Sequence, residues 1–144
     1  IKGRYSVIGM KPDLIWKCNL EKSKINRNAL EQESSFTVQT DPPIIALKSL
    51  IKESYFKIPS DLPAMSAGLF GYLSYEMINL IKKISSNLHK KDLGLADSIL
   101  FRPSIIIIID NVKGEIVAVN PIYANNKNNI KYTSKDLYDR SKKS

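Results

Sequence analysis

The chain has little of the chemistry on which most catalytic and metal sites depend. It contains one cysteine and one histidine in 144 residues, Cys18 and His89. A single cysteine excludes a disulfide within the chain and is typical of a reducing compartment. A lone histidine without cysteine or carboxylate neighbours at ligand spacing does not build a metal site. We therefore expect no catalytic residue and no metal site here, and we expect Cys18 to be a packed, inert thiol.

Long hydrophobic runs are also missing. Residues 105–109 are five isoleucines closed by Asp110, far short of the roughly 20 apolar residues that cross a bilayer. No secretory signal is visible. We therefore predict no membrane segment and a cytoplasmic location. A hydrophobic share of 43% is ordinary for a globular chain, and this length predicts one domain with a usable core.

The net charge of +8 comes from lysine far more than from arginine, which occurs only at positions 4, 27, 102 and 140. The lysines are scattered among acidic residues and do not form a basic stripe interleaved with aromatic residues. We interpret the charge as solvated surface. No nucleic-acid partner is expected.

Turn signals and alternating apolar residues predict several short strands. Pro12 and Asp13 are expected to form a turn between the first two. The isoleucine run predicts a strand covered on both faces, and Gly114 can take the positive φ that its hairpin turn requires. The strands predicted in this way are residues 4–10, 14–18, 24–27, 36–39, 99–101, 105–109 and 115–120.

Two main helices are predicted. Asp41 is expected to cap the first, which runs from about Pro43 to Tyr55. The second runs from Tyr75 to about Ser85. A polar linker and a short helix are expected near the end of the chain, over residues 125–129 and 134–143. The apolar faces predicted for the two main helices are Ile44, Leu47, Leu50 and Ile51, and Met77, Leu80, Ile81 and Ile84.

Residues 66–76, Ser-Ala-Gly-Leu-Phe-Gly-Tyr-Leu-Ser-Tyr-Glu, form the most informative segment. Small and large apolar residues alternate as in a buried strand, and Gly68 and Gly71 would leave room for a neighbouring backbone or a ligand. Tyr72 and Tyr75 stand where this strand runs directly into the second helix, and we expect both to be core residues. The segment is not a phosphate loop, because it lacks the Lys-Ser/Thr ending.

This segment closely resembles the Ala-Gly-Leu-Phe-Gly-Tyr-x-x-Tyr motif of chorismate-using enzymes, above all of the anthranilate synthase component I family. Other parts of the chain resemble the same family in the same order, and the resemblance weakens only after about Tyr123. Each motif is modestly specific, whereas their order and spacing together are highly specific. The matching stretches are residues 4–13, 14–18, 24–27, 93–97, 100–103 and 110–114.

The resemblance implies a fold that agrees with the pattern of elements. The family has two facing antiparallel sheets surrounded by helices, and we predict an α+β fold, a mostly antiparallel sheet with two main packed helices. Residues 1–123 are expected to be the N-terminal-type domain, incomplete at its N-terminus, because the chain opens on Ile1 in mid-strand. Residues 124–144 would be a linker and short helix leading towards an absent catalytic domain. Such a piece is expected to expose apolar surface and unpaired strand edges.

The resemblance also implies a function. The parent enzyme is a lyase of tryptophan biosynthesis that converts chorismate and ammonia into anthranilate and pyruvate. Ammonia comes from glutamine through an amidotransferase partner, component II, and magnesium is bound outside this chain. The present region would be a regulatory and scaffold portion, not catalytic alone.

Feedback inhibition by tryptophan supplies the one candidate site. In the family, the inhibitor pocket includes a Leu-Leu-Glu-Ser segment, absent here, and the strand that corresponds to Arg4, Tyr5 and Ser6. A guanidinium suits an amino-acid carboxylate. The plainer alternative makes Arg4 a surface ion pair and Tyr5 a core residue.

Three other functions remain open. The first is the N-terminal portion of aminodeoxychorismate synthase component I, from folate synthesis, which shares the glycine motif. The second is a complete, non-catalytic tryptophan-binding module. The third alternative is a relic with no activity.

Overall fold

The computed structural model describes residues 3–19, 21–55, 57–82 and 94–123. Its strands form one antiparallel sheet in the order β3-β2-β1-β5-β4. Strand β6 is not part of this order: it pairs with residues 106–110 of β5, whereas β4 pairs with residues 98–101. The predicted α+β class, with a mostly antiparallel sheet and two helices, is confirmed. The strands are β1 (Tyr5–Asn19), β2 (Lys22–Asn26), β3 (Thr37–Val38), β4 (Phe70–Leu73), β5 (Ser98–Asp110) and β6 (Glu115–Val119).

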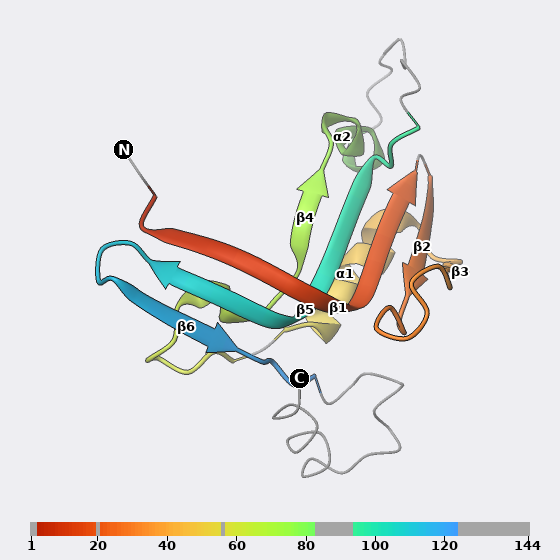
Figure 1. Ribbon diagram of the computed structural model, residues 1–144. Coiled ribbons are helices and arrows are strands. Elements are labelled where there is room, and N and C mark those ends of the chain that lie inside the picture. Colours follow the sequence, from red (N-terminus) through yellow and green to blue (C-terminus); the bar gives the residue numbers. More distant parts are fainter. Residues whose placement is uncertain (1–2, 20, 56, 83–93, 124–144) are drawn as a thin grey trace.

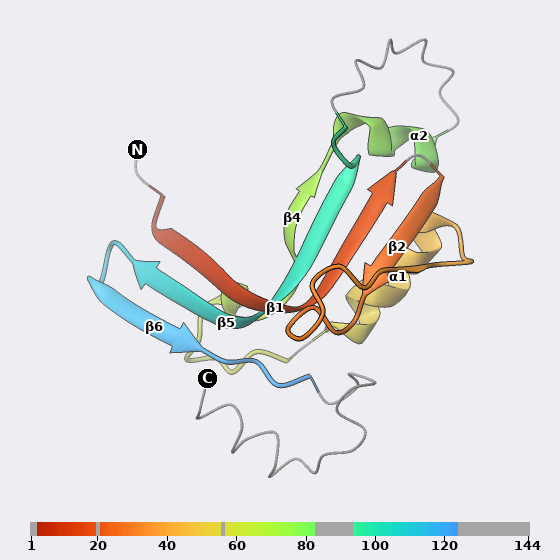
Figure 2. The same ribbon diagram turned by 45° about the vertical axis from the view of Figure 1, so that its right-hand side comes forward.

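Two long strands, β1 and β5, form the spine of the sheet and pair along almost their whole lengths. The predicted turn at Pro12 and Asp13 is wrong, because β1 continues through it. The register shifts between Pro12 and Leu14, and Lys11 has a φ of 49°. A bulge of this kind bends a strand without ending it, and the continuous partner β5 keeps both sides paired. Figures 1 and 2 show both strands bending at this point.

The bend divides the sheet into two parts. We call residues 14–19 and 98–102, with β2, β3 and β4, the helix half, because a helix covers one of its faces. Residues 5–10 and 105–110, with β6, are the hairpin half. The hairpin half contains the predicted turn at Gly114, whose φ of 69° confirms the expected glycine geometry.

Helix α1 (Pro43–Glu53) covers one face of the helix half (Figure 2). Its position was predicted correctly, but Asp41 does not cap it, since Pro42 occupies the cap position and makes no side-chain hydrogen bond. Ile51, expected in the core, is 55% exposed, while Ala46 is buried in its place. The buried face of α1 is therefore rotated slightly about the helix axis from the predicted face.

The second helix is shorter than predicted within the described residues. A 3-10 turn, η2 (Tyr75–Met77), leads into α2 (Ile78–Ile81), and Lys82 already has extended backbone angles. Met77 is buried as expected, whereas Ile81 is 68% exposed. Ile84, Ser85 and His89 lie outside the described residues, as do the predicted linker and final helix over residues 124–144.

The core lies between α1 and the helix half of the sheet. Trp16 and Leu14 are fully buried there, and the indole Nε1 of Trp16 donates a hydrogen bond of 2.7 Å to Oε1 of Gln39. Cys18 is 1% exposed, which confirms the packed thiol, and burial raises its pKa to about 11. The cluster consists of Leu14, Trp16, Cys18, Ile25, Leu47, Leu50 and Met77.

Candidate functional site

The predicted site residues Arg4, Tyr5 and Ser6 lie where β1 begins, beside the turn that joins β5 to β6. Arg4 forms a bidentate ion pair with Asp110, in which Nε donates to Oδ1 at 3.3 Å and to Oδ2 at 3.1 Å, and Nη2 donates to Oδ2 at 2.9 Å. The side chain of Arg4 is 48% exposed and that of Asp110 is 9% exposed. The guanidinium also stacks on its neighbour, with Cζ 4.8 Å from the Tyr5 ring centre.

Asp110 organises this corner. Besides the Arg4 pair, its Oδ1 accepts hydrogen bonds from the backbone N–H groups of Val112 and Lys113, at 3.0 and 3.1 Å. The hydrogen bonds from Arg4, followed by those from the turn, lower the pKa of Asp110 from 3.8 to about 2. The same pair raises the pKa of Arg4. An incoming carboxylate at Arg4 would therefore share the guanidinium with a firmly ionised partner.

Ser6 is tied to the same turn through Asn111. The Nδ2 of Asn111 donates to the hydroxyl of Ser6 at 3.2 Å and to the carbonyl of Gly3 at 3.1 Å. The structure thus brings Arg4, Tyr5 and Ser6 together with two residues of the turn that were not assigned to the site. The Asp-Asn pair at the start of the hairpin turn is a sequence signal for these two residues, but by itself it predicts a turn and not a binding site.

The part of the chain around the glycine motif, residues 64–73, is called the glycine segment below. It consists of the 3-10 turn η1 (Ala64–Ser66), a connector over residues 67–69, and β4. At Gly71, with a φ of 147°, an added Cβ would lie 2.0 Å from the carbonyl oxygen of Ile99. The predicted close approach of a neighbouring backbone is therefore confirmed at Gly71. Gly68, with a φ of 129°, has open space at the same position, so there glycine serves backbone conformation alone.

The expectation that β4 is a buried strand is wrong. Tyr72 is 43% exposed and Tyr75 is 75% exposed, so neither belongs to the core. β4 pairs with β5 alone among the described strands, so its side chains have a neighbouring strand on one side only. The hydroxyl of Tyr72 donates to the carbonyl of Ala96 at 2.6 Å, which fixes the ring against the loop before β5.

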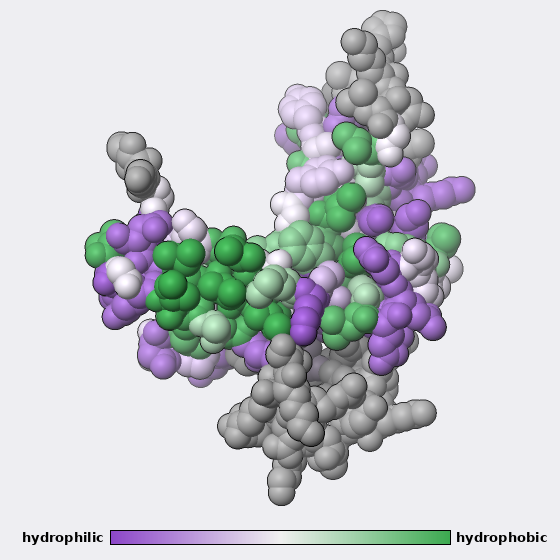
Figure 3. All heavy atoms as spheres, in the orientation of Figure 1, coloured by the Kyte–Doolittle hydropathy of each residue, from purple (hydrophilic) through white to green (hydrophobic). Residues whose placement is uncertain are grey.

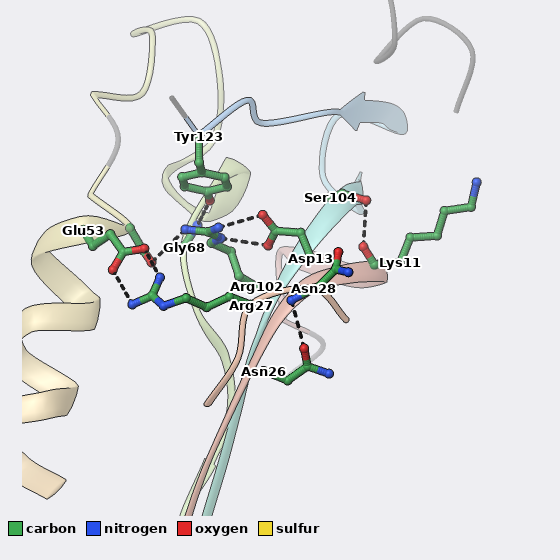
Figure 4. Close-up of polar contacts among 11 residues, drawn as sticks. Lys11, Asp13, Asn26, Arg27, Asn28, Glu53, Gly68, Arg102, Ser104 and Tyr123 are labelled. Atoms are coloured by element: carbon green, nitrogen blue, oxygen red, sulfur yellow. Dashed lines mark hydrogen bonds and ion pairs between the residues drawn. The ribbon is translucent and has the colours of Figure 1, made fainter. Parts of the chain in front are cut away.

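A buried polar cluster that sequence reasoning missed lies at the bend of the sheet (Figure 4). Arg102 is fully buried, and its Nε and Nη2 donate to the two carboxylate oxygens of Asp13 at 2.8 and 2.7 Å. Its guanidinium carbon lies 4.1 Å from the centre of the Tyr123 ring. The hydroxyl of Tyr123 in turn accepts a hydrogen bond of 3.0 Å from the N–H of Gly68.

This cluster joins segments far apart in the sequence. Asp13 belongs to the bulge of β1, Arg102 to β5, Gly68 to the connector, and Tyr123 to the segment after β6. A buried guanidinium needs both a carboxylate and aromatic or hydrogen-bonding neighbours to offset its desolvation. The cluster therefore holds the bend of the sheet and the segment after β6 together. It contains no pair of groups arranged for acid–base chemistry. A further ion pair, Arg27 with Glu53, holds the end of β2 against α1.

A cavity of about 440 Å³ lies between α1 and the glycine segment. Its lining is mostly apolar, and it includes Ser54, whose hydroxyl lies 3.5 Å from a guanidinium nitrogen of Arg102. An apolar side chain suits such a lining, whereas a phosphate or sugar does not. The residues around it are Leu47, Ile51, Ser54, Tyr55, Ile58, Ala67, Gly68, Leu69, Leu73 and Leu100.

The described part of the chain contains no group of three or more histidine, cysteine or acidic residues that could hold a metal ion. Nor does it contain a helix with the length and apolar character needed to span a membrane.

Comparison with known proteins confirms the resemblance noted from the motifs. No protein-family model matches the chain. The anthranilate synthase component 1 of Cereibacter sphaeroides is 46% identical over 123 residues, 85% of this chain and 24% of the relative. That of Acinetobacter calcoaceticus is 29% identical over 144 residues, 96% of this chain and 26% of the relative. The chain thus spans about a quarter of the length of these curated relatives.

A solved structure shows the same fold. The crystal structure of anthranilate synthase component I from Streptococcus pneumoniae TIGR4 superposes with a TM-score of 0.69 at 18% identity. The match covers 99% of this chain and 29% of that one.

Proposed function

The chain is a relative of the N-terminal region of anthranilate synthase component I, and from this premise we propose that it is the regulatory and scaffold portion of such an enzyme. The observation that carries the proposal is the 46% identity with the Cereibacter sphaeroides protein across 85% of the chain. The parent enzyme would be a lyase that converts chorismate and ammonia into anthranilate and pyruvate. Magnesium would be bound outside this chain, and a glutamine amidotransferase subunit would deliver the ammonia.

The regulatory part of the proposal concerns Arg4, Tyr5 and Ser6. We infer that tryptophan binds at this corner through its carboxylate, which suits the half-exposed guanidinium of Arg4. Asp110 would hold that guanidinium in place, and the hydroxyl of Ser6 lies on the same strand, one residue beyond Tyr5. Inhibition then requires tryptophan to bind one arrangement of the enzyme better than the other.

A chimera tests the proposal. This chain would replace the matching N-terminal region of the Cereibacter sphaeroides protein, and anthranilate fluorescence would be followed with chorismate, ammonium and magnesium. We expect anthranilate formation that tryptophan inhibits. A folded chimera, verified by circular dichroism, that forms no anthranilate would contradict the proposal.

Substitution of Arg4 separates the regulatory part from the rest. In the chimera, Arg4→Ala should weaken inhibition by tryptophan about tenfold or more, because a charge-assisted bidentate contact is lost. Uninhibited activity should stay the same. Lys113→Ala is the matched control, since Lys113 is an exposed cation on the adjacent turn. Equal inhibition of the Arg4→Ala variant and the parent chimera would remove Arg4 from the site.

A further inference from the structure

The cavity beside the C-terminal end of α1 has a buried side and an open side. Leu47 is 9% exposed and Ser54 is 4% exposed, so these two lining residues belong to the buried side. Ile51, Tyr55 and Leu73 are more than half exposed and surround the opening. The lining comes from α1 and the residues after it, from the glycine segment and from β5. The cavity is therefore reachable from solvent and closed at its inner end by packed residues.

Exposed apolar surface by itself does not identify a ligand. The hairpin half also has such surface, over β1 and β5 (Figure 3). The cavity differs because several segments surround one volume, as in the sites that bind small molecules. An apolar cavity of about 150 Å³ holds a benzene ring. The volume of about 440 Å³ found here accommodates a molecule of one or two rings.

Ser54 supplies a hydrogen-bond donor on the buried side of the cavity. Among the described residues, its Oγ has one hydrogen-bonding neighbour, Nη1 of Arg102 at 3.5 Å. The arginine nitrogen is the donor in this contact, and the distance is at the long limit of a hydrogen bond. The contact therefore leaves the hydroxyl hydrogen of Ser54 without an acceptor. Since a buried donor is costly to leave unpaired, an oxygen atom of a ligand would stabilise it.

The surroundings of Ser54 favour a ligand without charge. Both carboxylate oxygens of Asp13 accept hydrogen bonds from Arg102, so the charge of the buried guanidinium is already compensated. None of the residues that line the cavity is acidic or basic. Ser54 also ends α1, and the last carbonyl groups of a helix carry partial negative charge. A carboxylate would lose its hydration here without gaining a counter-ion.

We propose that this cavity binds a neutral, mainly apolar molecule of one or two rings, with one oxygen that accepts a hydrogen bond from the hydroxyl of Ser54. Cyclic and aromatic ketones have this chemistry. The cavity shares no residue with the corner formed by Arg4, Tyr5 and Ser6, so this inference goes beyond the proposed function and does not depend on it.

The proposed ligand would also affect the bend of the sheet. Ser54 contacts Arg102, and the N–H of Gly68 donates to the hydroxyl of Tyr123. Two lining residues are thus in contact with the buried cluster at the bend. A ligand that binds the folded chain and not the unfolded chain raises the free energy of unfolding, so the urea midpoint should rise with its concentration.

A matched pair of probes tests the inference. Tetralone and tetralin share a two-ring frame, but tetralone has a ketone oxygen and tetralin has none. Naphthoate supplies a two-ring anion of similar size. Each probe would be titrated into the 144-residue chain labelled with carbon-13 in its leucine methyl groups. The assigned resonances of Leu47 and Leu100, which both line the cavity, give the dissociation constant and the place of binding.

Two variants with matched controls separate the hydrogen bond from the apolar lining. Ser54→Ala removes the donor, and Ser35→Ala, at an exposed serine, is its control. Ala67→Phe fills the cavity from the connector, where the backbone is extended and accepts a larger side chain. Ala118→Phe, at an exposed position of β6, is the control for added size. Circular dichroism verifies that each variant is folded.

We expect tetralone to shift the lining resonances in a saturable manner and naphthoate to leave them unchanged at the same concentration. Ser54→Ala should weaken tetralone binding about tenfold, because the ketone oxygen would be buried without a donor. Tetralin should bind this variant as it binds the unmodified chain. Ala67→Phe should abolish binding of both probes, and the two controls should bind both normally.

Three results would overturn the inference. The first is that tetralone leaves the resonances of the lining residues unchanged. The second is that Ser54→Ala weakens tetralone and tetralin equally, or weakens neither. The third is that naphthoate shifts the same resonances as strongly as tetralone. None of these results depends on whether the chimera forms anthranilate, so the cavity and the proposed function can fail separately.

Discussion

The helix half and the hairpin half are built from the same two strands, β1 and β5, yet they differ in how much of their apolar side chains is buried. In the helix half, Leu14 and Trp16 are fully buried beneath α1. In the hairpin half, Ile8 and Ile116 are exposed although they are no less apolar. The comparison shows that a strand's sequence indicates which residues require cover, but not whether the same chain supplies it.

The buried ion pair at the bend should be the most sensitive point, because it joins the two halves. Asp13→Ala leaves the Arg102 guanidinium buried without its carboxylate, and we expect a loss of about 3–5 kcal/mol in the free energy of unfolding. Urea unfolding followed by the fluorescence of Trp16 would measure it. Arg4→Ala is the control, since the side chain of Arg4 is 48% exposed and its removal should lower the stability much less. Equal losses in the two variants would contradict the account.

Truncation of one apolar residue in each half tests the comparison directly. Leu14→Ala should cost about 2–5 kcal/mol, because it leaves a cavity in the core. In the 144-residue chain, Ile8→Ala should change stability by about 0.5 kcal/mol or less, because its side chain is already half in solvent. Urea midpoints of the two variants give the ratio of their losses in stability. A large loss for Ile8→Ala would show that its face is covered within the chain.

Acid should destabilise the hairpin half through protonation of Asp110, and this effect should be smaller than that of the core substitutions. The pKa of Asp110 is lowered from 3.8 to about 2 by Arg4 and the turn. The stabilisation from this shift is fully present above about pH 4 and is lost as the pH falls through about 2. Asp110→Asn should flatten this part of the curve of stability against pH. The measurement is a series of urea midpoints across that range, and an unchanged curve would contradict the assignment.

Local signals in the sequence predicted much of this fold. The prolines before α1, the glycine of the hairpin turn and the alternation in β2 each act within a few residues, so their elements appear where expected. The fusion of two predicted strands into β1 was missed, because a long partner strand overrides a turn signal at Pro12. Helix α1 was predicted with its buried face slightly misplaced, since packing against the sheet decides that orientation.

The candidate site was less accessible from sequence. Arg4 pairs with Asp110 across 106 positions, and Arg102 pairs with Asp13 across 89. No short motif reports such pairs, because they depend on the register of β1 against β5. Tyr72 and Tyr75 were misjudged for a related reason, as the sequence does not show that β4 lies at an edge.

Anthranilate formation by the chimera with the Cereibacter sphaeroides protein tests the central claim most directly. The account predicts a folded enzyme that converts chorismate and ammonium to anthranilate, that tryptophan inhibits, and that loses this inhibition in the Arg4→Ala variant. A folded chimera that forms no anthranilate, while the unmodified Cereibacter sphaeroides protein does so under the same conditions, would contradict it.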